Sequence, residues 1–399
     1  MKRYLLYILL IIPFLSGCVS DDCSDCVDMA YDTRVKLKII WPGNLSTTKS
    51  AESPELNIND FTLFVFNEDN TLNTIKKVNN PTFSTTIPYS SSVTMNITST
   101  AKTIYVVANC SDLLSNSPTS SIATQVRDAI ANPLITSLKN LFDSTLAVDY
   151  DKIIENGSLV HSGKGDIVSA GESNPYNYVS TINIKPIVSK FDIKVSSISS
   201  TPIDFIGSIH SISGFILNSR SNAKLFSSNA NYSYIHGAYN ILWMQYNPIN
   251  FGFEDTPSIK DNLRADITYT PGNIPFSTNP ISIYSPENDT IATLGNQHKT
   301  LVVLKIKYKM ISMDGTEEYF DRFLTVSLNP SEASTLSNKR GTRYIIDFKL
   351  SGNYYGSLSP LSSLMQPYSP LPPLPFKTTK NLIYVEPDDY SKVKSSEWK

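Results

Sequence analysis

The stretch LVVLKIKYKM, residues 301–310, alternates apolar residues with lysines along most of its length. Successive side chains of a β-strand point to opposite faces of a sheet, so this alternation predicts a strand with one face toward a core and one toward water. We interpret the lysine row as a solvated sheet face and not as a cationic binding site. The inward residues are Leu304, Ile306, Tyr308 and Met310, and the outward ones are Lys305, Lys307 and Lys309.

Similar short runs, rich in Val, Ile, Thr, Tyr and Phe, occur along the whole chain between clusters of Pro, Asn, Asp and Ser. Strands at this spacing without regular intervening helices predict a mainly β protein, an antiparallel sandwich or barrel, and disfavour parallel βαβ units. The runs are VKLKIIW (35–41), FTLFVF (61–66), FSTTIPY (83–89), VTMNIT (93–98), TIYVVAN (103–109), TINIKPIVSKFDIKV (181–195), SIHSISGFIL (208–217), LRADITYT (263–270), EEYFDRFLTVSL (317–328) and TRYIIDFKL (342–350).

One helical insertion interrupts the first group of strands. Ser120 or Ser121 is placed to cap it, and Pro133 is expected to end or kink it. A second short helical piece is predicted around 134–142, and we expect the apolar stripe of both pieces to pack against a sheet. The stripe consists of Ile122, Val126, Ile130, Leu138 and Phe142.

The N-terminus has the order of a lipoprotein signal. Lys2 and Arg3 precede an apolar run that ends at Phe14, and the sequence Leu-Ser-Gly-Cys follows at 15–18. The run is too short to span a bilayer as a helix, and small residues precede the cysteine. We therefore predict a signal peptide at 1–17, lipid on Cys18, and attachment to a membrane outside the cytoplasm.

Composition shifts divide the rest of the chain. Residues 18–30 are short and acidic and predict a lipidated tether, and the polar stretch SAGESNPYN (169–177) predicts a domain boundary. The predicted units are an N-terminal β-sandwich domain at 31–172, a C-terminal one at 173–366, and a proline-rich tail at 367–399. In the tail, NLIYVEP (381–387) predicts one further strand.

No pattern for catalysis, cofactors or metals was found. The formal charge of −2 offers no basic field for nucleic acid, and the four histidines are scattered. The segment SGKG (162–165) lacks the spacing of a phosphate loop and is interpreted as a turn. We expect no enzyme activity. Besides the lipidated cysteine, Cys23, Cys26 and Cys110 form an odd set whose disulfide state stays open.

Several segments together resemble the fimbrillin-like anchor and accessory subunits of Bacteroidia type V pili. The head of the mature chain, CVSDDCSDC (18–26), resembles that family's lipidated cysteine and acidic spacer. Further segments follow in the family's order: TRVKL (33–37), FTLFVFNEDN (61–70), TIYVVANC (103–110), INIKPIVSKFDIKV (182–195) and NKRGTRYIIDFKLSG (338–352). Cys23 and the long proline-rich tail depart from the family pattern.

The resemblance implies two transthyretin-like antiparallel β-sandwich domains and a surface lipoprotein that anchors or assists a fimbrium. It also implies an outer-membrane location and contact with fimbrial shaft subunits by strand addition. Shaft subunits of the family lose their first strand by cleavage, commonly after arginine. Residues 42–60 contain Lys49 but no arginine, so we predict that the first strand is retained.

The proposed donor strand is formed by Leu382, Ile383, Tyr384 and Val385, with the alternative that these residues fold back on their own sheet. Two other functions stay open: a shaft or tip fimbrillin released by proteolysis, or a surface lipoprotein that binds glycan or a host ligand. The second would use exposed rings such as Trp243, Tyr246 and the tyrosines near 232–239.

Overall fold

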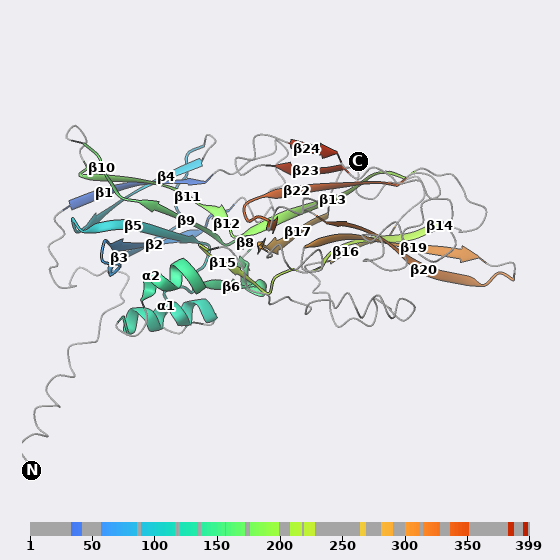
Figure 1. The fold of residues 1–399 in the computed structure, drawn as a ribbon, viewed down its shortest axis with the longest axis horizontal. Helices are drawn as coiled ribbons and strands as arrows, with labels where there is room; N and C mark the ends of the chain where they lie inside the picture. Colours follow the sequence, from blue (N-terminus) through green and yellow to red (C-terminus); the bar gives the residue numbers. More distant parts are fainter. Residues whose placement is uncertain are drawn as a thin grey trace, which may run out of the picture.

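The chain is mainly β over the residues that the computed structural model describes (Figure 1). These are residues 33–41, 57–85, 89–115, 118, 120–133, 137–155, 157–171, 176–198, 208–217, 219–227, 264–268, 281–289, 300–311, 314–327, 336–350, 382–386 and 394–397. Four larger sheets dominate this part of the chain, which confirms the prediction of a mainly β protein.

Two sheets form the N-terminal sandwich. In spatial order, sheet A contains β10 (Val168–Ser169), β11 (Tyr178–Asn183), β1 (Thr33–Trp41) and β4 (Tyr89–Ile97). Sheet B contains β12 (Lys185–Pro186), β9 (His161–Asp166), β5 (Ala101–Ala108), β2 (Asp60–Asn67) and β3 (Leu72–Asn79). A core of Val, Leu, Ile, Phe, Met and Ala side chains fills the space between them.

Sheet B is covered on both faces around its central strand β2, which therefore carries six buried residues in succession, whereas its edge strand β3 is partly exposed. Its second face is covered by α1 (Ser121–Ala131), α2 (Leu138–Asn140) and the π-helical turn η3 (Leu141–Thr145) (Figure 1). Ser120 caps α1 by accepting a hydrogen bond from the Ala123 N–H at 3.3 Å, and α1 ends two residues before Pro133. Both features were predicted. Of the predicted stripe, only Ile130 lies outward, 37% exposed.

The second half forms two more sheets. Sheet C contains β17 (Ile281–Pro286), β13 (Val188–Ile198), β22 (Arg343–Leu350), β23 (Leu382–Glu386) and β24 (Lys394–Glu397). Sheet D contains β16 (Arg264–Thr268), β14 (Ser208–Leu217), β19 (Leu301–Ile311) and β20 (Glu317–Ser327). Most strand pairs are antiparallel, but β1 pairs parallel with β11 and β13 pairs parallel with β22.

Short elements connect the two halves. The 3-10 turn η4 (Tyr150–Lys152) follows β6 (Ala147–Asp149), and β6 pairs with β15 (Asn222–Lys224) from the second half. The other short pairs are β7 (Ile154–Glu155) with β8 (Ser158–Leu159), and β18 (Asn288–Asp289) with β21 (Leu336–Asn338). One hydrophobic cluster runs from the helical insertion into the core between sheets C and D.

Three details differ from the sequence-based expectations. Residues 83–85 lie outside any strand, and the strand β3 at 72–79 was not predicted. The segment SGKG belongs to β9 and is not a turn. The predicted boundary at residues 172 and 173 lies before β11 and β12, whose pairing with β1 and β9 joins them to the first sandwich. The change of sandwich falls between β12 and β13.

The glycines of β9 permit a close approach between the two sheets. A Cβ built on Gly163 would lie 2.4 Å from the Asn183 carbonyl oxygen, and one built on Gly165 would lie 2.9 Å from Ile182 Cγ1. The strands β9 and β11 therefore pass each other where only glycine fits. The residues that suggested a turn in the sequence close one side of the sandwich instead.

Candidate functional site

The first strand, β1, lies where the sequence predicted a strand, and its side chains alternate between buried and exposed. Val35, Leu37 and Ile39 are fully buried and point into the sandwich, and the residues between them point outward. β-Branched and other aliphatic side chains favour such a half-buried strand. β1 is therefore an integral part of the core.

Hydrogen-bonded neighbours flank β1 on both edges. β4 pairs antiparallel with all nine residues from Thr33 to Trp41, and β11 pairs parallel with residues 35–40. Removing β1 would open a groove with two unpaired strand edges and an apolar floor. Such a groove can accept an extended segment from another chain.

Burial favours retention of β1. Transferring an aliphatic side chain of this size out of water stabilises by about 1.5–3 kcal/mol, and β1 contributes three of them. The opposing sheet B supplies the other wall of the core. The residues of β2 and β5 in this core are Phe61, Leu63, Val65, Ala101, Ile104, Val106 and Ala108.

The chemistry predicted on either side of β1 lies outside the described residues. This applies to Cys18 in the tether and to Lys49 in the segment between β1 and β2. The rings of Trp243 and Tyr246, predicted for the alternative ligand-binding function, also lie outside the described residues. The lipid on Cys18 and the absence of cleavage after β1 stay predictions.

The tail strand folds back in this single chain. β23 pairs antiparallel with β22, with Tyr344 opposite Val385 and Ile346 opposite Ile383. β24 then pairs with β23. The structure thus has the second of the two predicted arrangements for Leu382–Val385, whereas donation to a neighbouring subunit stays a prediction.

A guanidinium group ties the second half to the segment that covers the helical insertion. Arg340 Nη1 donates to the carbonyl oxygens of Lys224 at 3.1 Å and Leu225 at 2.6 Å, and its Nη2 donates to Phe226 at 3.0 Å. Glu287 lies 3.9 Å from its Nε. The amino-acid sequence carries no signal for this contact, because the partners are backbone carbonyls more than 110 positions away.

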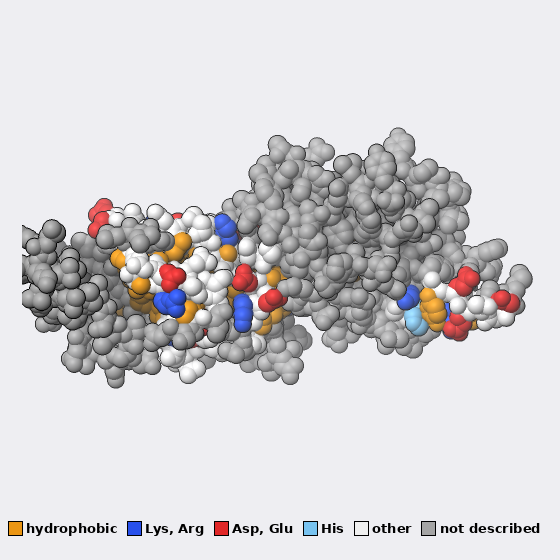
Figure 2. All heavy atoms as spheres, turned by 90° about the horizontal axis from the view of Figure 1, so that it is seen from below, with side chains coloured by type: hydrophobic (Ala, Val, Ile, Leu, Met, Phe, Trp, Pro, Cys, Tyr) orange, Lys and Arg blue, Asp and Glu red, His pale blue; other side chains and the backbone are white. Residues whose placement is uncertain are grey.

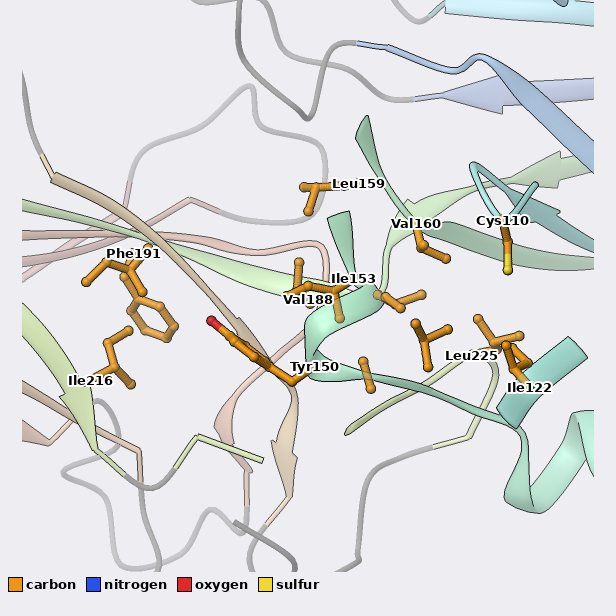
Figure 3. Close-up of a cluster of buried hydrophobic side chains, with 14 of the residues drawn as sticks. Cys110, Ile122, Tyr150, Ile153, Leu159, Val160, Val188, Phe191, Ile216 and Leu225 are labelled. Carbon is orange, nitrogen blue, oxygen red and sulfur yellow. The ribbon is translucent and has the colours of Figure 1, made fainter. Parts of the chain in front are cut away.

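A hydrogen bond of Tyr150 also links the two halves of the chain. Its hydroxyl donates to the Tyr284 carbonyl oxygen at 3.0 Å, and its side chain is 3% exposed. Figure 3 shows the Tyr150 ring between Phe191 and Ile216 on one side and Ile122 and Val160 on the other. Burial raises the pKa of Tyr150, with a further contribution from Asp151.

An ionic cluster joins the helical insertion to sheet B. Tyr105 donates to Asp143 Oδ1 at 2.5 Å, and Lys139 Nζ donates to Oδ2 at 2.7 Å. Burial acts to raise the pKa of Asp143, but these two hydrogen bonds and the charges of Lys139 and Lys164 lower it overall. Burial and the bond to Asp143 raise the pKa of Tyr105. The cluster fastens the insertion to the sheet.

The described part of the chain has neither a metal site nor a membrane-spanning helix. No group of three or more His, Cys, Asp or Glu residues there is arranged to hold a metal ion. No helix in the same residues is long and apolar enough to cross a membrane. Cys110 is 4% exposed and lies in the hydrophobic cluster that runs from the helical insertion into the core between sheets C and D.

The N-terminal half of the chain is similar to a known protein family. Residues 34–194 match the family model of the major fimbrial subunit protein, FimA. The chain is fimbrillin-like. The matched region begins one residue into β1 and ends inside β13, so it contains the whole N-terminal sandwich and its helical insertion. The match supports a role as a fimbrium subunit at the cell surface, in contact with other fimbrial subunits.

Solved structures extend the likeness in fold to most of this fimbrillin-like chain. A candidate cell adhesion protein from Bacteroides eggerthii DSM 20697 superposes with a TM-score of 0.54 at 15% identity, covering 92% of this chain and 96% of that one. A fimbrilin from Porphyromonas gingivalis W83 gives a TM-score of 0.46 at 13% identity, covering 83% and 93%. The tip fimbrial protein Mfa3 from Porphyromonas gingivalis gives 0.44 at 13%, covering 92% and 100%. No curated protein matches the sequence.

Proposed function

We propose that this fimbrillin-like chain is the lipid-anchored base subunit of a fimbrium, held in the outer membrane through Cys18. The observation that best supports this proposal is that β1 is paired along both edges and buried on its inner face. The lipobox precedes this strand by a short tether, and the segment after it contains no arginine. A subunit that keeps β1 keeps its lipid, and it becomes the fixed end of the polymer.

The decisive measurement is the N-terminus of the protein on intact cells. We expect mass spectrometry to find an acylated peptide that begins at Cys18, joined to an uncut chain through Lys49. In the matched variant Cys18→Ala, fimbriae should detach into the medium while shaft assembly continues. A mature N-terminus after Lys49 would refute the base assignment and would indicate a shaft or tip subunit.

The proposed contact to the next subunit uses the tail. Among the described strands, β23 pairs with β22 on one edge and with the terminal strand β24 on the other, and it comes after a long proline-rich segment of the sequence. Exchange of β23 into a neighbour's groove would replace one set of ladder hydrogen bonds by another. We do not expect catalysis to take part.

Deletion of residues 367–399 should abolish co-purification with shaft subunits. Deletion of residues 387–399 is the matched control, because it removes β24 but leaves β23. If the longer deletion leaves assembly intact, the tail is not the donor, although the chain can still be an anchor through Cys18.

A further inference from the structure

The outer face of sheet A carries charge of one sign only. Arg34, Lys36 and Lys38 are exposed and follow one another along β1. The four strands of sheet A contain no acidic residue at all. The face therefore has three cations in a row and no carboxylate of its own, in a chain whose net charge is −2.

The neighbouring strands present small polar groups beside these cations. In the register of sheet A, Lys36 lies opposite Thr94, Lys38 lies between Ser92 and Thr181, and Arg34 lies opposite Asn96. These four neighbours are also exposed. Hydroxyl and amide groups can donate hydrogen bonds to phosphate oxygens alongside the cations.

The lysine row of β19 provides an internal comparison. Lys307 of β19 lies opposite Asp321 of β20, and Lys309 forms an ion pair with Glu317. That row is thus matched by acids on the next strand. Figure 2, which views the molecule from the helix side, likewise shows red and blue side chains close together on the described residues. Sheet A differs because its cations have no acidic counterpart within the sheet.

The position of β1 determines what this face can meet. Only the 15 residues from Val19 to Thr33 separate the lipid-bearing cysteine from Arg34. Even fully extended, they span at most about 50 Å. Once the lipid is inserted, sheet A therefore stays near the membrane surface, and the orientation of the domain depends on which of its faces the surface attracts.

We propose that the outer face of sheet A is a docking surface for the phosphate headgroups of the membrane that holds the lipid. This inference rests on the proposed anchor function. Each basic residue near an anionic surface favours contact by roughly fivefold, so three favour it by at most on the order of a hundredfold. The aspartates of the tether and Asp32 just after it repel an anionic surface and reduce this preference, so we expect the face to favour contact by about tenfold.

Amine labelling tests the orientation. The lipidated protein is inserted into vesicles of phosphatidylcholine, alone or mixed with phosphatidylglycerol, and reacted with an amine reagent. On the anionic vesicles the labelling rate of Lys36 and Lys38 should fall by about tenfold, and high salt should restore it. Lys305 and Lys307 report on sheet D, at the opposite side of the molecule in Figure 1, and should not change.

Equal labelling of Lys36 and Lys38 on both vesicles would overturn the proposal. Protection that is already present in detergent would also overturn it, because another part of the chain, such as the acidic tether, would then cover the face. Protection by a soluble anionic polysaccharide without protection by vesicles would overturn the lipid surface as the partner.

A second measurement separates this inference from the anchor itself. The mature chain from residue 18 with Cys18→Ser should sediment with the anionic vesicles at low salt. The added triple substitution Arg34→Gln, Lys36→Gln and Lys38→Gln should reduce binding by about tenfold, and the pair Lys305→Gln and Lys307→Gln should not. Equal binding of all three proteins would refute the docking face, whereas a missing acyl group on Cys18 of the native protein would refute the anchor.

Discussion

Leu37 offers a direct test of the place of β1 in the core. Its side chain is fully buried between sheets A and B, in a cluster that includes Val35 and Ile39. The substitution Leu37→Ala keeps the backbone pairing with β4 and β11 but removes buried methyl groups. Such substitutions cost about 2–5 kcal/mol, since the cavity collapses only in part. We expect about 3 kcal/mol at this site.

The matched control is Lys36→Ala on the same strand. Its side chain is exposed, so the free energy of unfolding should change by less than about 0.5 kcal/mol. In thermal unfolding followed by circular dichroism, Leu37→Ala should lower the Tm of the N-terminal sandwich by about 6–12 °C. A loss below about 1 kcal/mol, or an equal loss in both variants, would contradict the assignment of β1 to the core.

Three further substitutions test other parts of the structure. Gly163→Ala should destabilise by about 1–3 kcal/mol in urea unfolding, because the new Cβ meets the Asn183 carbonyl oxygen at 2.4 Å; an unchanged midpoint would show that the sheets can separate there. Arg340→Met should cost about 2–4 kcal/mol, since three backbone carbonyls lose their donors, and limited proteolysis should then cut near residue 226; resistance equal to that of the wild type would count against a tie at this junction. Asp143→Asn should lower the free energy of unfolding at pH 7 and lower it much less at pH 3. The pKa of the Asp143 carboxyl is lowered in the folded protein, so the carboxylate stabilises the fold above its ordinary pKa of 3.8. That contribution is lost as the pH falls through the lowered pKa. A difference between wild type and variant that is the same at both pH values would refute the role of this carboxylate.

Local patterns were sufficient where one face of an element is buried. The alternation in β19 predicted the buried positions of Leu304 and Ile306, and the capping serine with a four-residue stripe predicted α1. These signals depend only on the side-chain period of the element. They were therefore visible without knowledge of any neighbour.

Pairings between distant segments were not visible in this way. β11 was placed in the second domain because the polar stretch before it suggested a boundary, yet it pairs with β1 more than 140 positions away. β3 was missed because an edge strand with the adjacent lysines Lys76 and Lys77 shows no alternation. Gly163 suggested a turn, although its role is set by the strand that passes over it.

The candidate site was predicted in part. The sequence identified β1 as a strand, and it also identified the strand in the tail. It did not show that β1 is flanked on both edges or that β23 lies beside β22. Both depend on the order of the strands in a sheet, which local patterns do not show. The chemistry at Cys18 depends on covalent processing of the chain.

The double pairing of β1 bears on how the protein carries load. In a chain held by its N-terminus and pulled by a polymer, tension enters at Thr33 and runs along the strand. The ladder hydrogen bonds to β4 and β11 lie roughly across that direction, and they are loaded together in shear. Rupture then requires many bonds to break at once, whereas a strand pulled sideways would unzip one bond at a time. A retained first strand would thus give the proposed anchor a high resistance to pulling force.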